Sequence, residues 1–206
     1  GQLEISEKTA AERIYKLQMA LNDTIKQATD EDKEKLKDKI KELERDKVNL
    51  SPEDKKELED LLDKGKELAD DLLANDIDVE DMMNQLEKWE EKTKLATSKQ
   101  ELKEAIAKAK EAMKNNPKVN KEKLDQAIKY AEQVLGKDDA NQSTIDYAAQ
   151  GLEQAMQGFN ESVAEKEAAD EAKRDLWSKI NEAKVKQKEQ ISQASKDRLT
   201  KAIEDG

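Results

Sequence analysis

Apolar residues recur along this chain every three to four positions, the spacing that places side chains on one face of an α-helix. The first stripe predicts a helix over residues 6–28. A second helix is expected after Thr29, which can cap it together with Asp32. The stripes of these two helices consist of Ile14, Leu17, Leu21 and Ile25, followed by Leu36, Ile40 and Leu43.

Capping residues mark where the next two helices begin. Ser51, Pro52 and Glu53 combine a capping hydroxyl, a proline suited to the first helical position and an acid in the first turn. Asp78 with Asp81 is expected to open a fourth helix. The apolar members of these helices are Leu58, Leu61, Leu62, Leu68, Leu72 and Leu73, then Val79, Met83 and Leu86 with Trp89 nearby.

Few residues interrupt the second half of the chain. The motif Asn115-Asn116-Pro117 stops a helix, because the residue before a proline avoids the helical region. Asn120 restarts a helix, which Gly136 ends. Ser192 or Ser195 is expected to start the last helix.

Two of the predicted helices are long. Residues 79–115 contain a capping box from Ser98 to Glu101, but no Gly or Pro precedes it closely, so we expect a continuous or nearly continuous helix. Asn141 starts a helix that meets no breaker before about Lys188, which is roughly 70 Å if straight. A helix of that length is more than one bundle needs, so we expect it to enter a second bundle.

Composition supports helices and limits the size of their cores. The 206 residues include 6 Gly and 2 Pro, too few for the turns of a β-rich fold. Hydrophobic residues make up only 35% of the chain, so narrow cores shared by two or three helices are favoured over one large interior. We predict an all-α chain, an elongated series of three-helix bundles joined by shared long helices over residues 79–115 and 141–190.

The charge balance excludes several classes of partner. Lys and Arg number 38 and Asp and Glu number 49, a net charge of −11, and the two signs alternate along the helices. Nucleic acids and anionic membrane surfaces both require a basic face or segment, so neither is expected as a partner. No run of 18 apolar residues exists, so no membrane insertion is predicted. We expect a monomeric rod.

Two stretches of the second half share a pattern of apolar and capping residues. One consists of Leu102, Ile106, Ala109, Asn120, Leu124 and Ile128, and the other of Leu176, Ile180, Ala183, Ser195, Leu199 and Ile203. Repetition of this kind indicates an array built from one supersecondary unit. Residues 1–95 match this pattern poorly, which predicts a distinct N-terminal module; the alternative is a degenerate relative of the repeat over Ser51 to Trp89.

From Leu102 to Phe159 the chain resembles the FIVAR module, a three-helix repeat of Gram-positive surface proteins and secreted glycosidases. The most specific part runs from Asp138 to Met156, where an acidic-Ala-Asn-Gln turn precedes an Ala-rich third helix. The resemblance implies a cell-surface or secreted context, a spacer role and, in some members, protein or glycan binding. It brings no catalytic residues. The expected domains are an N-terminal helical bundle over 1–95, a FIVAR-like bundle over 96–160, and a linking helix with a truncated second repeat over 161–206.

The residues on which most catalysis depends are missing. With no His and no Cys, the chain lacks the commonest general base, the best metal ligands and a thiol nucleophile. Residues 75–81 and 138–141 are oxygen-rich turns without the glycine and distal glutamate of a calcium loop, so helix capping by Asp78 and Asn141 is the favoured interpretation. We expect no enzyme activity, no cofactor and no metal.

Aromatic side chains are the best candidates for partner binding, because they anchor many interfaces. Trp89 lies near a leucine stripe, which favours core packing over binding. Trp177 aligns with Lys103 of the first copy, so it should be partly exposed, either for binding or for packing at a bundle junction. Tyr15 lies beside the first stripe and can face either way.

The resemblance to the FIVAR module, together with the missing catalytic residues, implies a non-catalytic, adhesin-like segment of a bacterial cell-wall protein that binds a host extracellular protein, acts as a spacer, or both. Residues 1–95 are expected to hold the binding module, because spacers repeat whereas recognition elements tend to be unique. The alternatives are a purely structural stalk, an accessory module of a secreted glycosidase, and a cytosolic coiled coil or de novo helical scaffold. The breaks at Pro52 and Pro117 argue against the last of these.

Overall fold

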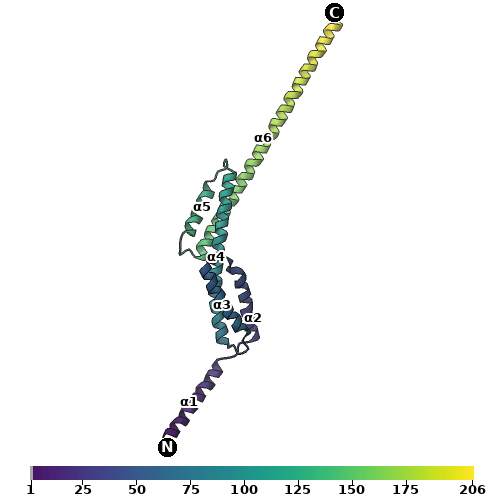
Figure 1. Ribbon diagram of the computed structural model, residues 1–206. Helices are drawn as coiled ribbons and strands as arrows, with labels where there is room; N and C mark the ends of the chain where they lie inside the picture. The colour runs from purple at the N-terminus through teal and green to yellow at the C-terminus, as the bar shows by residue number, and fades with distance from the viewer. Residues whose placement is uncertain (1) are drawn as a thin grey trace. The chain divides into compact units, whose positions relative to one another are not determined.

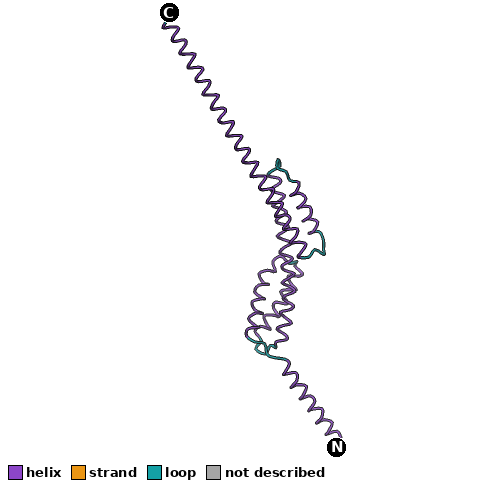
Figure 2. Tube along the Cα trace, turned by 180° about the vertical axis from the view of Figure 1, so that it is seen from behind, coloured by secondary structure: helices purple, strands orange, loops and turns teal. Residues whose placement is uncertain are grey.

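The computed structural model describes the backbone of residues 2–206 and the side chains of residues 6–21 and 24–206. This part of the chain is helical, with one short 3-10 turn and no strand (Figure 1). The elements are α1 (Gln2–Thr24), α2 (Asp30–Asp46), η1 (Lys47–Asn49), α3 (Pro52–Asp70), α4 (Asp76–Asn115), α5 (Glu122–Leu135) and α6 (Gln142–Glu204). Short loops join them (Figure 2). The prediction of an all-α chain is confirmed.

The chain divides into two compact units. The first comprises Gly1–Glu104 with Val134–Tyr147, and the second comprises Ala105–Gln133 with Ala148–Gly206. The helices α4, α5 and α6 therefore each contribute residues to both units.

The expected caps form at most helix starts. The backbone N–H of Asp32 donates to Thr29 Oγ1 at 3.1 Å, and the backbone N–H of Asp54 donates to Ser51 Oγ at 3.2 Å. The start of α4 differs from the prediction, because Asp78 is not its cap. Instead Asn75 Oδ1 accepts the backbone N–H of Asp78 at 2.7 Å, and α4 begins at Asp76.

In the first unit, α2, α3 and the beginning of α4 bury one apolar stripe each. The buried members are Leu36, Ile40 and Leu43 of α2, Leu58, Leu62 and Ala69 of α3, and Val79, Met82 and Leu86 of α4. Leu72 and Leu73 do not continue the α3 stripe as predicted, and they are 78% and 85% exposed. The reason is that α3 ends at Asp70, so both leucines lie in the following turn.

Helix α1 ends at Thr24, four residues before the predicted end. The next residues pair in an extended conformation with the loop before α4: Ala28 N–H donates to Ala74 O at 2.9 Å, and Asp76 N–H donates to Lys26 O at 2.7 Å. A helix cannot continue through residues held in this way. All described side chains of α1 from residue 6 to residue 21 are exposed, including its apolar stripe.

The two long helices α4 and α6 contain no break. The expected continuity over residues 79–115 is confirmed. The expected last helix starting at Ser192 or Ser195 is wrong, because α6 continues to Glu204. No Gly or Pro occurs between Phe159 and the end of α6, and serine costs little in a helix interior. Every side chain of α6 from residue 171 onward is exposed.

Replacing Leu36 with alanine tests the core of the first unit. Leu36 is fully buried, so Leu36→Ala should lower the free energy of unfolding by about 2–5 kcal/mol. The control Leu72→Ala changes an exposed side chain and should stay within about 0.5 kcal/mol. Urea unfolding followed by circular dichroism measures both. Similar effects for the two variants would contradict this packing.

Candidate protein-interaction site

The helices α2, α3 and α4 follow the same plan as the later part of the chain, displaced by 66 positions (102 minus 36, for example). Residues at this separation are buried in both copies. The pairs are Leu36 and Leu102, Ile40 and Ile106, Leu58 and Leu124, Leu62 and Ile128, Val79 and Ile145, and Leu86 and Leu152. The buried positions therefore match in the two copies, and these six pairs also match in size, whereas Leu43 and Met82 correspond to the smaller Ala109 and Ala148.

The turn before α4 and the turn before α6 have matching hydrogen bonds. Ala74 N–H donates to Asp71 O at 3.4 Å, and at the matching position Ala140 N–H donates to Lys137 O at 3.3 Å. Asn75 caps α4 as described above, and Asn141 Oδ1 accepts the backbone N–H of Thr144 at 2.9 Å to cap α6. These matches favour a relative of the repeat in the first half over a module of distinct plan.

The first copy carries a tryptophan and a lysine that pack on each other. Trp89 is partly buried against the core, and Lys92 Nζ lies 4.6 Å from the centre of its ring. The same ammonium group donates to Asp54 Oδ1 at 2.7 Å. This hydrogen bond lowers the pKa of Asp54 below its ordinary value of 3.8; partial burial opposes the effect and Ser51 adds to it.

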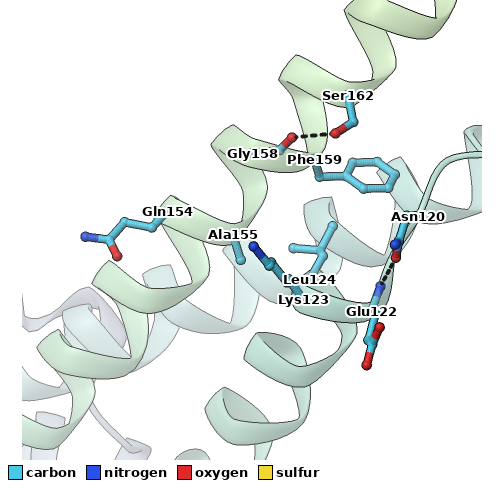
Figure 3. A pocket seen from close by; sticks show the side chains of 9 residues that line it. All are labelled: Asn120, Glu122, Lys123, Leu124, Gln154, Ala155, Gly158, Phe159 and Ser162. Atoms are coloured by element: carbon cyan, nitrogen blue, oxygen red, sulfur yellow. Dashed lines mark hydrogen bonds between the residues drawn. The ribbon is translucent and has the colours of Figure 1, made fainter.

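The second copy has no such cluster, and an open groove lies there instead (Figure 3). The residues 66 positions after this cluster are smaller or uncharged: Ala155 is equivalent to Trp89, Gly158 to Lys92, and Asn120 to Asp54. The groove has a volume of about 380 Å³. It lies in the second unit between the start of α5 and α6, and is lined by Asn120, Glu122, Lys123, Leu124, Gln154, Ala155, Gly158, Phe159 and Ser162.

The groove has an apolar base and a polar rim. Leu124 and Phe159 are 1% and 4% exposed, and a Cβ added at Gly158 would meet no atom within 4 Å. At the rim, Asn120 Oδ1 accepts the backbone N–H of Glu122 at 3.0 Å, and Ser162 Oγ donates to Gly158 O at 3.1 Å. An apolar base with a few polar groups around it suits the binding of a side chain from a partner.

The three aromatic candidates from the sequence lie on three different helices. Trp89 belongs to α4 and packs in the first unit, as favoured for it. Tyr15 of α1 and Trp177 of α6 are each 62% exposed. Sequence reasoning did not find the groove, because an alanine and a glycine on a helix give no signal unless they are compared with Trp89 and Lys92.

Among the described residues, no group of three or more Asp or Glu side chains is placed to hold a metal ion. Within the same part of the chain, no helix is long and apolar enough to span a bilayer. Comparison with known protein families, curated proteins and solved structures finds no match.

Filling the groove with its counterpart residues tests the equivalence of the two copies. Ala155→Trp with Gly158→Lys should raise the free energy of unfolding by about 1–3 kcal/mol, because a ring becomes buried and a helical glycine is removed. The control Gly151→Lys, also a glycine of α6 with open space around it, should give about 1 kcal/mol or less. A double variant less stable than the original chain would show that the groove does not match the Trp89 site.

The ion pair of Asp54 predicts a pH dependence. Because its pKa is lowered in the folded state, the stabilisation is present above pH 3.8 and is lost as the pH falls through the folded-state pKa. Asp54→Asn should therefore flatten the fall in unfolding free energy as the pH drops below about 4. The control Asp60→Asn replaces an exposed acid of the same helix and should leave the slope nearer to that of the original chain. Equal slopes for all three proteins would contradict the role of Asp54.

Proposed function

We propose that this chain is a non-catalytic repeat segment of a bacterial cell-surface protein, which spaces a binding surface away from the cell wall and binds a host extracellular protein. The observation that carries the proposal is the reuse of one three-helix plan at a separation of 66 residues. Reuse of a supersecondary unit is the usual construction of extended arrays. The resemblance of residues 102–159 to the FIVAR module supports the cell-surface context.

The shared plan changes where the binding surface is sought. Recognition was expected in residues 1–95 because that half looked unique, and this reason no longer holds. Exposed aromatic side chains remain the best anchors for a protein partner. Trp177 and Tyr15 meet this criterion, whereas Trp89 is committed to packing against its own core.

A purely structural stalk is the second candidate function. It is favoured by the same repeat, because the buried positions are conventional core residues and the described part contains no metal-binding cluster. The stalk and the binding segment differ in one respect, namely whether the chain retains a host protein.

Capture from host plasma on the immobilised 206-residue chain separates these functions. Binding predicts a retained protein whose amount falls at least about 10-fold with Trp177→Ala or with Tyr15→Ala, since each removes a candidate anchor. The control is Leu199→Ala, an exposed apolar residue of α6, which should retain the original amount. No retained protein would favour the stalk, and equal retention by all variants would place the binding surface elsewhere.

A further inference from the structure

The groove of the second copy is open, whereas side chains of the chain itself fill the equivalent space in the first copy. There, Trp89 and Lys92 fill the corresponding space, and Asp54 neutralises the lysine. A matching occupant for the open groove is therefore an apolar side chain with a tryptophan and basic residues close by. Such a segment occurs in α6 around Trp177, which is 62% exposed.

One face of α6 carries both the groove and this segment. Positions separated by three or four residues form a continuous seam from the groove to the exposed end of the helix. The seam consists of Gly151, Ala155, Gly158, Ser162, Glu165, Ala169, Ala172, Leu176, Ile180 and Ala183. Its first part has the groove and the two glycines with open space, whereas its second part has Leu176 and Ile180, which are 60% and 36% exposed.

Two copies of this seam fit each other when the helices run antiparallel. A two-fold axis beside residue 167 places Leu176 of one copy opposite Gly158 of the other, nine positions on either side of the axis. The same axis places Ile180 opposite Gln154, the neighbour of Ala155. The large side chains thus meet the open positions, and the contact is self-complementary, as a two-fold dimer requires.

The charged residues of α6 also match in this antiparallel arrangement. Residues 148–161 contain two acids and no base, a net charge of −2, and residues 173–186 contain five bases and two acids, a net charge of +3. The two-fold axis places these two segments opposite each other, whereas residues 162–172, with four acids and one base, face the same residues of the other copy. Lys173, for example, lies opposite Glu161. Complementary charges of this kind fix the register of paired helices.

Trp177 lies on the same side of the seam as Phe159 of the groove. It lies 18 residues beyond Phe159, which is five full turns, so both side chains leave α6 in the same direction. Phe159 points toward the start of α5 in the groove (Figure 3). The two-fold axis runs perpendicular to the plane that contains the two antiparallel helices, so α5 lies on the same side of this plane in both copies. Each Trp177 points to that side and therefore lies beside α5 of the other copy.

We propose that two copies of this chain form an antiparallel dimer through α6, in which Leu176, Trp177 and Ile180 of each copy occupy the groove of the other. This replaces the sequence-based expectation of a monomer. The dimer needs no host protein, but it uses Trp177, which is also a candidate anchor for one; Tyr15 of α1 lies outside the dimer contact, so the Tyr15→Ala capture test is independent of it.

Disulfide cross-linking tests the register, since the chain has no cysteine of its own. In the variant Gly158→Cys with Leu176→Cys, the two thiols of one chain lie about 27 Å apart along the same helix, too far for an internal bond. Oxidation should therefore give a dimer linked by two disulfides. The control Gly158→Cys with Leu199→Cys uses a leucine of similar exposure, 64%, that lies outside the seam. It should link at least about 10-fold less.

Sedimentation of the full chain at increasing concentration provides the second measurement. The original chain should dimerise, and filling its groove by Ala155→Trp with Gly158→Lys should weaken the dimer at least about 10-fold at unchanged helix content. Glu165→Ala should strengthen it, because this carboxylate is the only charged group in the seam. A chain that stays monomeric up to about 1 mM, or equal cross-linking of both cysteine pairs, would overturn the proposal.

Discussion

In the first unit, burial of one narrow apolar stripe per helix is the interaction on which the rest of the structure depends. Transfer of leucine-sized side chains from water opposes the conformational entropy that ordered helices lose. The stripes of α2, α3 and α4 pack into one core, in which Leu36, Leu58 and Leu86 are each fully buried. The remaining positions on these helices are free to carry the charged residues that make up 42% of the chain.

The same constraint explains how two copies of one plan differ in their surfaces. Some side chains of the stripe keep their size in both copies, as with Leu58 and Leu124, and others change it, as with Leu43 and Ala109. Side chains at its edge can vary, because their loss exposes little of the core. Trp89 and Lys92 close this edge in the first copy, whereas Ala155 and Gly158 leave it open in the second. A candidate binding site thus arises from two small residues without any change in the plan.

Local signals in the sequence predicted much of this fold. Thr29, Ser51 and the motif at Pro117 mark helix boundaries through interactions within a few residues, so a single sequence suffices to find them. Leu72 and Leu73 were placed wrongly because their spacing continues the stripe of α3, although the helix stops at Asp70 and the next residues turn. Ser195 was placed wrongly because a serine can cap a helix or lie within one, and nothing near it forces a break.

Features that depend on comparing distant residues were harder to predict. The two copies share positions of burial, yet Thr93 in one corresponds to Phe159 in the other, and both are buried. Only the constant separation of the Leu and Ile positions and of the Ala-Asn turns reveals the relation. The groove followed from that comparison, because it is defined by what its counterpart contains.

Hydrogen exchange measured by mass spectrometry on the dilute chain distinguishes two copies of one buried plan from a single folded copy. Two copies should give slow exchange over α2 and α3, and slow exchange over the helix segments 66 positions later, with fast exchange in α1 and beyond residue 171. Fast exchange throughout α5, or protection beyond residue 171 equal to that of residues 142–160, would contradict it.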